Sequence, residues 1–95
     1  MVIRVFEIAH AADTAQQGAC VHAALVCGLR EQDKIVVSFR GVDTATSSFV
    51  NSSFVALLDI LPLPAMKGRI QVIDATKQIQ AMIKLCVERA SLACA

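Results

Sequence analysis

Hydroxyl side chains gather at Thr44, Thr46, Ser47 and Ser48, directly after a run rich in β-branched residues. An apolar stretch follows, so this segment has the pattern of a strand, a turn and the start of a helix. The free N–H groups and the positive dipole end of such a helix favour an anion, including a phosphate on a serine. Alternatively, Thr46, Ser47 or Ser48 only caps the helix by accepting a backbone hydrogen bond.

His10, Asp43 and Asp74 form a second group of interest, because each is expected to follow a predicted strand. The carboxyl ends of parallel strands meet at one edge of a sheet, where ligands often bind. The two carboxylates could converge there and make polar contacts or hold a weak cation. Helix capping and turn formation account for the same residue types without any ligand.

Motifs for catalysis and metal binding are missing from the sequence. There is no phosphate-binding glycine-rich loop, no GxSxG serine and no pair of metal ligands at tight spacing. His22 is expected to be a partly exposed helix residue. The four cysteines are expected to be reduced, small buried hydrophobic residues: Cys20, Cys27, Cys86 and Cys94. We therefore expect no catalytic residue, no metal site and no cofactor, and a protein that is not an enzyme.

Hydrophobic periodicity predicts three strands and three helices in alternation. The strands are expected at Val2–Ile8, Lys34–Phe39 and Arg69–Ile73. The helices are expected at about 14–29, 48–61 and 76–93. The order β-α-β-α-β-α indicates an α/β fold with a mostly parallel sheet covered by helices.

Capping residues and prolines mark the expected ends of these helices. Asp13 or Thr14 is expected to cap the first helix, with Gln16 completing a loose capping box. Pro62 and Pro64 are expected to stop the second helix, because proline cannot continue the backbone hydrogen-bond ladder.

The chain carries an excess of apolar residues, with an apolar fraction of 56% and a mean hydropathy of +0.60. The first helix is apolar on most sides, which predicts that it is sandwiched within the domain or by a neighbouring subunit. The strand at 34–39 suits a central strand covered on both faces. A homodimer or larger homo-oligomer is therefore one alternative for this protein.

Charge and length argue against several classes of protein. The net charge is +1 and the 95 residues include no Trp or Tyr, so nothing favours nucleic-acid binding. No apolar run approaches the roughly 20 residues that span a bilayer. The N-terminal stretch is interrupted by Arg4 and Glu7, as expected for a strand rather than a signal peptide. We expect one domain over residues 1–95, in the cytoplasm and without membrane association.

The segment from Ile35 to Phe49 resembles the strand, turn and helix of STAS domains, the fold of the anti-sigma factor antagonists. It reads Ile-Val-Val-Ser-Phe-Arg-Gly-Val-Asp and, after two residues, Thr-Ser-Ser-Phe. The resemblance covers about residues 14–75 and is closest to bacterial STAS-like domains of unknown function. It implies a single STAS-like domain with a regulatory or protein-interaction role.

The resemblance also implies a site at this turn. In the antagonists a serine at the start of the helix is reversibly phosphorylated by a partner kinase, and Ser48 matches that serine. Phe49 replaces the glycine that usually follows, and Thr46 replaces an acidic residue. The turn and helix at 46–58, including Ser47 and Asn51, are expected to face a protein partner, by analogy an ATP-binding kinase-like protein. Besides a homo-oligomer, the alternative is a small ligand-binding or enzymatic domain that uses the strand-end residues named above.

Overall fold

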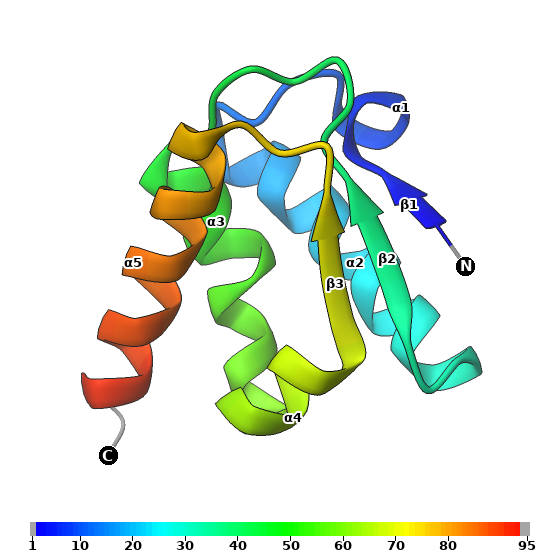
Figure 1. Cartoon of the computed structure of the whole chain (residues 1–95), viewed down its shortest axis with the longest axis vertical. Helices are drawn as coiled ribbons and strands as arrows, with labels where there is room; N and C mark the ends of the chain where they lie inside the picture. Colours follow the sequence, from blue (N-terminus) through cyan, green and yellow to red (C-terminus); the bar gives the residue numbers. More distant parts are fainter. Residues whose placement is uncertain (1, 94–95) are drawn as a thin grey trace.

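The computed structural model describes residues 2–93 and shows strands alternating with helices (Figure 1). The strands are β1 (Val2–Arg4), β2 (Ile35–Ser38) and β3 (Ile70–Ile73). The helices are α1 (Val5–Ala9), α2 (Ala15–Glu31), α3 (Ser47–Ser53), the 3₁₀ helix η1 (Val55–Asp59), α4 (Leu63–Arg69) and α5 (Lys77–Ala93). The strands are parallel in the order β1-β2-β3. This confirms the predicted α/β class and its parallel sheet.

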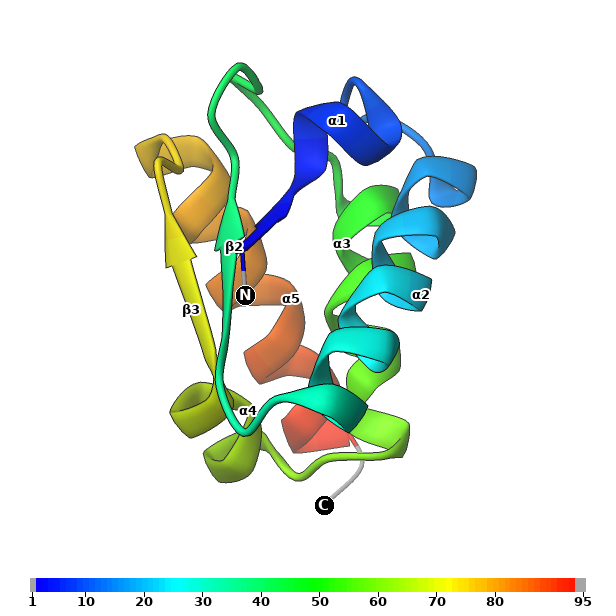
Figure 2. The same ribbon diagram turned by 90° about the vertical axis from the view of Figure 1, so that its right-hand side faces the viewer.

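The sheet buries one face against helices. Ile3 of β1 aligns with Val37 of β2, which aligns with Val72 of β3, and this row faces the core. Figure 2 shows α2, α3 and α5 on that side of the sheet. On the other side, where the described residues place no helix, Val2 is 52% exposed and Val36 is half-buried. The central position predicted for β2 is confirmed, but helices cover only one of its faces.

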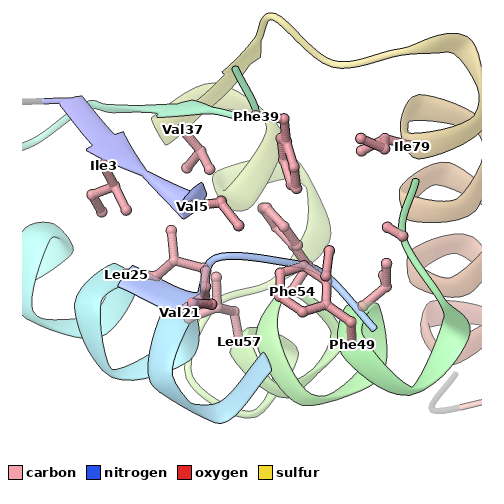
Figure 3. Close-up of a cluster of buried hydrophobic side chains, with 14 of the residues drawn as sticks. Ile3, Val5, Val21, Leu25, Val37, Phe39, Phe49, Phe54, Leu57 and Ile79 are labelled. Carbon is pink, nitrogen blue, oxygen red and sulfur yellow. The ribbon is translucent and has the colours of Figure 1, made fainter. Parts of the chain in front are cut away.

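Three phenylalanines form the centre of the core between the sheet and the helices (Figure 3). Phe39 follows β2, and its ring lies edge-on to Phe49 of α3, with centroids 6.4 Å apart. Phe54, at the end of α3, stacks on Phe39 at 6.2 Å. Both geometries are favourable for aromatic pairs. Apolar side chains from the sheet and the helices surround these rings: Ile3, Val5, Val21, Leu25, Val37, Leu57 and Ile79.

The predicted strand Val2–Ile8 is wrong after its third residue, because the chain turns into helix α1 at Val5. Val5 and Ala9 are both buried, and their spacing of four residues matches one helical turn. His10 ends the helix in the left-handed conformation, with φ 65°, and its N–H bonds to the carbonyl of Phe6 at 3.0 Å. The β-branched residues of this run predict a strand, but their composition does not prevent a short helix when Val5 and Ala9 are buried together.

Helix α2 begins one residue later than the Asp13–Gln16 capping box would place it. Thr14 is the cap: its hydroxyl accepts from the Gln17 N–H at 3.1 Å, and the Gln17 side chain accepts from the Thr14 N–H at 3.0 Å. Asp13 donates its own N–H to the same Gln17 oxygen. The alternative in which Thr14 caps the helix is therefore confirmed, with Gln17 in place of Gln16.

The buried face of α2 consists of Gly18, Val21, Leu25, Gly28 and Leu29. The opposite face carries exposed alanines and two exposed cysteines: Ala15, Ala19, Ala23, Cys20 and Cys27. Within residues 2–93 the helix is therefore packed on one side only, not sandwiched.

The expectation of buried cysteines is wrong for Cys20 and Cys27, since helical rotation points both thiols outward. Cys86 is buried, as expected, and its Sγ lies 3.7 Å from Met82 Sδ. Cys94 lies outside the described residues.

The second predicted helix, 48–61, is divided into α3 and the 3₁₀ helix η1, which is a correction. The Ser53 hydroxyl donates to the carbonyl of Phe49 at 2.8 Å, and such back-bonding competes with the α-helical ladder. Pro62 and Pro64 do more than end the preceding helix, because a new helix begins at this point. Pro62 precedes helix α4, and Pro64 lies in its first turn. Proline is tolerated there since first-turn N–H groups have no partner within the helix.

No single helix within residues 2–93 is long and apolar enough to cross a bilayer. Ser47–Asp59 and Leu63–Arg69 reach the required length and composition only together, and they are bent by 111°.

Candidate functional site

Thr46 fixes the turn between β2 and α3. Its hydroxyl accepts from the Phe49 N–H at 3.3 Å and donates to the carbonyl of Asp13 at 2.8 Å. Its backbone N–H bonds to the carbonyl of Ala12 at 2.9 Å. Thr46 therefore caps α3 and ties the turn to the connection between α1 and α2.

The start of α5 holds the same loop from the other side. Gln78 accepts from the Ala45 N–H at 2.8 Å and donates to the Ala45 carbonyl at 2.9 Å. Thr76, two residues before Gln78, makes a second contact: its hydroxyl donates to the carbonyl of Asp43 at 2.8 Å. The same hydroxyl caps α5 by accepting from the Ile79 N–H. In Figure 1 the loop crosses the end of the molecule toward which the strands point. Because its backbone is held on both sides, the turn is rigidly positioned.

Ser47, Ser48 and Asn51 are the exposed polar side chains of α3. Ser47 and Ser48 occupy the first two helical positions, and neither hydroxyl has a hydrogen-bond partner among residues 2–93. Of the three capping candidates, Thr46 takes the structural role, which leaves both serines free to contact a partner. No charged residue occurs from Thr44 to Leu58, so the surface is polar but uncharged.

Phe49, which replaces the glycine of the antagonist pattern, packs in the hydrophobic core. Its ring is fully buried, and its carbonyl lies so close to α2 that a Cβ added at Gly18 would be 2.5 Å from it. The close approach of α2 and α3 therefore requires glycine at that position. Sequence reasoning missed both Gly18 and Gln78 as supports of the turn, since each acts across more than 30 residues on a segment that shares no local pattern with it.

The prediction that His10 follows a strand is wrong, because β1 ends at Arg4 and His10 ends helix α1. Asp74 directly follows β3, and Asp43 lies in the loop after β2. Asp74 has φ 56° and accepts from the Ser38 hydroxyl at 3.0 Å. His10 lies edge-on to Phe6, with ring centroids 5.9 Å apart, and Asp43 is exposed. None of the three main cavities among residues 2–93 is lined by any of them. A ligand site that uses them stays a prediction.

Residues 2–93 contain no group of three or more His, Cys, Asp or Glu side chains arranged to hold a metal ion. His22 is half-buried on α2, as expected, and its Nδ1 lies 3.1 Å from the carbonyl oxygen of Ser53. Because a carbonyl can only accept, this contact assigns the proton to Nδ1.

Comparison with known protein families matches residues 17–80 to the STAS-like domain of unknown function (DUF4325). The chain belongs to this STAS-like family. The match confirms the resemblance predicted from β2 and the hydroxyl-rich turn. No curated protein and no solved structure gives a significant match.

The matched part of this STAS-like domain runs from the first turn of α2 to the first turn of α5. It includes Gly18, Thr46, Phe49 and Gln78, the residues that hold the turn in place. Strand β1, helix α1 and His10 lie outside it. The family match thus covers most of the residues that support the turn, except Ala12 and Asp13, whose carbonyls bond to Thr46.

Proposed function

We propose that this STAS-like domain is a non-enzymatic protein-interaction module that presents the turn and helix at 46–58 to a partner. The observation that carries the proposal is that different residues of the turn hold its backbone and face solvent. Thr46 is used in holding the turn, whereas Ser47, Ser48 and Asn51 are exposed on a rigidly held backbone. A preorganised surface loses little conformational entropy on binding.

The resemblance to anti-sigma factor antagonists favours an ATP-binding kinase-like protein as this partner. It also makes Ser48 the candidate for regulation by phosphorylation. A phosphate adds a charge of about −1.5 to −2, which would fall on a segment that has no charge of its own. Such a charge would remove a partner that docks through uncharged or acidic contacts.

The test is capture of the partner from the native host by wild-type protein, Ser48→Asp and Ser91→Asp. Ser91 lies near the C-terminal end of α5, remote from the turn, so its variant adds the same charge elsewhere (Figure 1). We expect Ser48→Asp to lose the partner while its circular dichroism spectrum is unchanged, and Ser91→Asp to retain it. Equal capture by both variants would show that the turn is not the docking surface.

Self-association is a second candidate function, favoured by the edge of the sheet at β1. Val2, Phe6 and Ile8 are 52%, 46% and 38% exposed, which is unusual for large apolar side chains. The outer edge of β1 is unpaired within the described residues, and an unpaired edge strand can pair with a second copy. Light scattering after gel filtration tests this idea. A homo-oligomer should have a mass above the 10.1 kDa of one chain, and Val2→Lys should lower the measured mass.

A further inference from the structure

A groove between α2 and the segment that links η1 to α4 lies away from the turn. Its volume is about 470 Å³, within the size range of small-molecule sites. One wall is the face of α2 that carries His22, Val26 and Arg30, and the other includes Ile60 and Leu61. His22 and Arg30 are eight residues apart on the helix, so the groove extends about 12 Å along α2.

Basic side chains mark both ends of this groove. Arg30 and Arg69 lie at the end formed by the last turn of α2, and His22 lies at the other end. No carboxylate lines the groove, and the one ion pair among residues 2–93 joins Arg4 to Glu7, elsewhere in the fold. Neither arginine therefore forms an ion pair with a carboxylate among residues 2–93.

Arg69 is held in a fixed orientation at this end. Its Nη2 donates to the carbonyls of Leu29 at 2.7 Å and Gln32 at 3.2 Å, and its Nε donates to the carbonyl of Asp33 at 2.9 Å. These bonds leave Nη1 without a partner among the described residues. The C-terminal end of α2 contributes a partial negative charge equivalent to about −0.5. Two full positive charges from the arginines outweigh it.

The middle of the groove is apolar. Val26 and Leu61 are half-buried, while Ile60 at the rim is 59% exposed. A bound ligand that covered Ile60 would remove this apolar surface from water. Charge at one end and apolar walls along the middle define an elongated ligand with an acidic group at one end.

We propose that this groove binds a small apolar ligand that carries one acidic group, either a carboxylate or a phosphate. The acidic group contacts Arg30 and the free N–H groups of Arg69, and the apolar body lies against Val26, Ile60 and Leu61. The basic end of the groove is remote from Ser47 and Ser48, because the start of α3 and helix α4 lie at opposite ends of the molecule (Figure 1). Only the end of the 46–58 segment is near the groove, since Leu58 precedes Ile60 by two residues. The binding of a small ligand in the groove does not depend on the proposed docking of a partner.

The test uses decanoate, decyl phosphate and decan-1-ol as probes, followed by NMR shifts and calorimetry. The two acids are titrated below their critical micelle concentrations and the alcohol below its solubility limit. We expect saturable binding of at least one acid, with shifts at Val26, Leu29 and Leu61, and weaker binding of the alcohol. The two acids distinguish a carboxylate from a phosphate as the preferred head group. Absence of saturable binding of both acids, or shifts centred elsewhere, would overturn the proposal.

Two variants separate the contribution of the charged end of the groove to ligand affinity from that of its apolar wall. Arg30→Gln should weaken acid binding about two- to fivefold, as for a partly exposed ion pair, without changing alcohol binding. Arg89 on α5 does not line this groove, so Arg89→Gln serves as the matched control. Ile60→Asn should weaken acids and alcohol alike, by at least about fourfold, the effect of one buried methylene. Equal affinities for Arg30→Gln and Arg89→Gln would show that the acid does not bind at this groove.

Discussion

The hydroxyl of Thr46 donates a hydrogen bond to the backbone carbonyl of Asp13 at 2.8 Å, across 33 residues of sequence. The same oxygen accepts from the Phe49 N–H and so caps helix α3. One side chain therefore sets both the start of α3 and its position against the connection before α2. The serines that follow are presented in a defined geometry because this threonine carries the structural contacts.

Removing the Thr46 hydroxyl should destabilise the domain. Thr46→Val keeps the shape of the side chain but loses the cap and the bond to Asp13, which should lower the free energy of unfolding by about 1–2 kcal/mol. Thr46→Ser retains the hydroxyl and should lose much less. Urea denaturation measures both values, and equal stability of the two variants would contradict the assigned role.

The close packing of α2 on α3 predicts opposite effects of two glycine-to-alanine changes. At Gly18 a new Cβ would lie 2.5 Å from the carbonyl of Phe49 and 2.7 Å from Cβ of Ser52, so Gly18→Ala should cost about 1–3 kcal/mol of stability. At Gly68, within α4, a Cβ has no neighbour within 4 Å. Gly68→Ala should therefore be neutral or stabilise by up to about 1 kcal/mol. Thermal unfolding of the pair checks this, and a tolerated Gly18→Ala would argue against the packing described.

Gln78 should be sensitive to loss of its amide donor. Gln78→Glu keeps an acceptor for the Ala45 N–H but places a carboxylate oxygen beside the Ala45 carbonyl, so we expect a loss of about 1–3 kcal/mol. Gln71→Glu, an exposed position on β3, is the matched control and should change stability by less than about 0.5 kcal/mol. Chemical denaturation of both variants gives the comparison; similar losses would remove Gln78 as a support of the turn.

The left-handed conformation of His10 predicts a clear preference among substitutions. His10→Val introduces a β-branched side chain at φ 65°, which should cost about 1–2 kcal/mol. His10→Asn should be tolerated, since asparagine adopts this conformation readily. Melting temperatures of the two variants test the assignment, and a valine variant as stable as the asparagine variant would contradict it.

The sequence predicted the features of the fold that depend on local pattern. The apolar run around Val36, the periodic residues of α5 and the cap at Thr14 identified elements that the structure contains. The family match confirms the resemblance that rested on β2 and the turn. These signals lie within single elements or between neighbours, where periodicity and capping rules apply directly.

Other features depended on tertiary contacts and could not be predicted in this way. Helix α1 forms because Val5 and Ala9 both pack into the core, although the run Val2–Ile8 is rich in β-branched residues, which favour a strand. The break after Ser53 and the helix that begins after Pro62 arise from side-chain back-bonding and first-turn proline chemistry. At the candidate site, the hydrogen bonds of the Thr46 hydroxyl with Asp13 and Phe49 distinguish it from the exposed serines, and the bond to Asp13 spans 33 residues of sequence.

Hydrogen exchange of the domain, free and bound to its captured partner, tests the docking surface most directly. If the turn and helix at 46–58 form the interface, the added amide protection in the complex should be centred on Ser47, Ser48 and Asn51. The exposed edge at β1 and α1 should exchange equally in both states. Protection centred on residues 2–9, with 46–58 unchanged, would contradict the account.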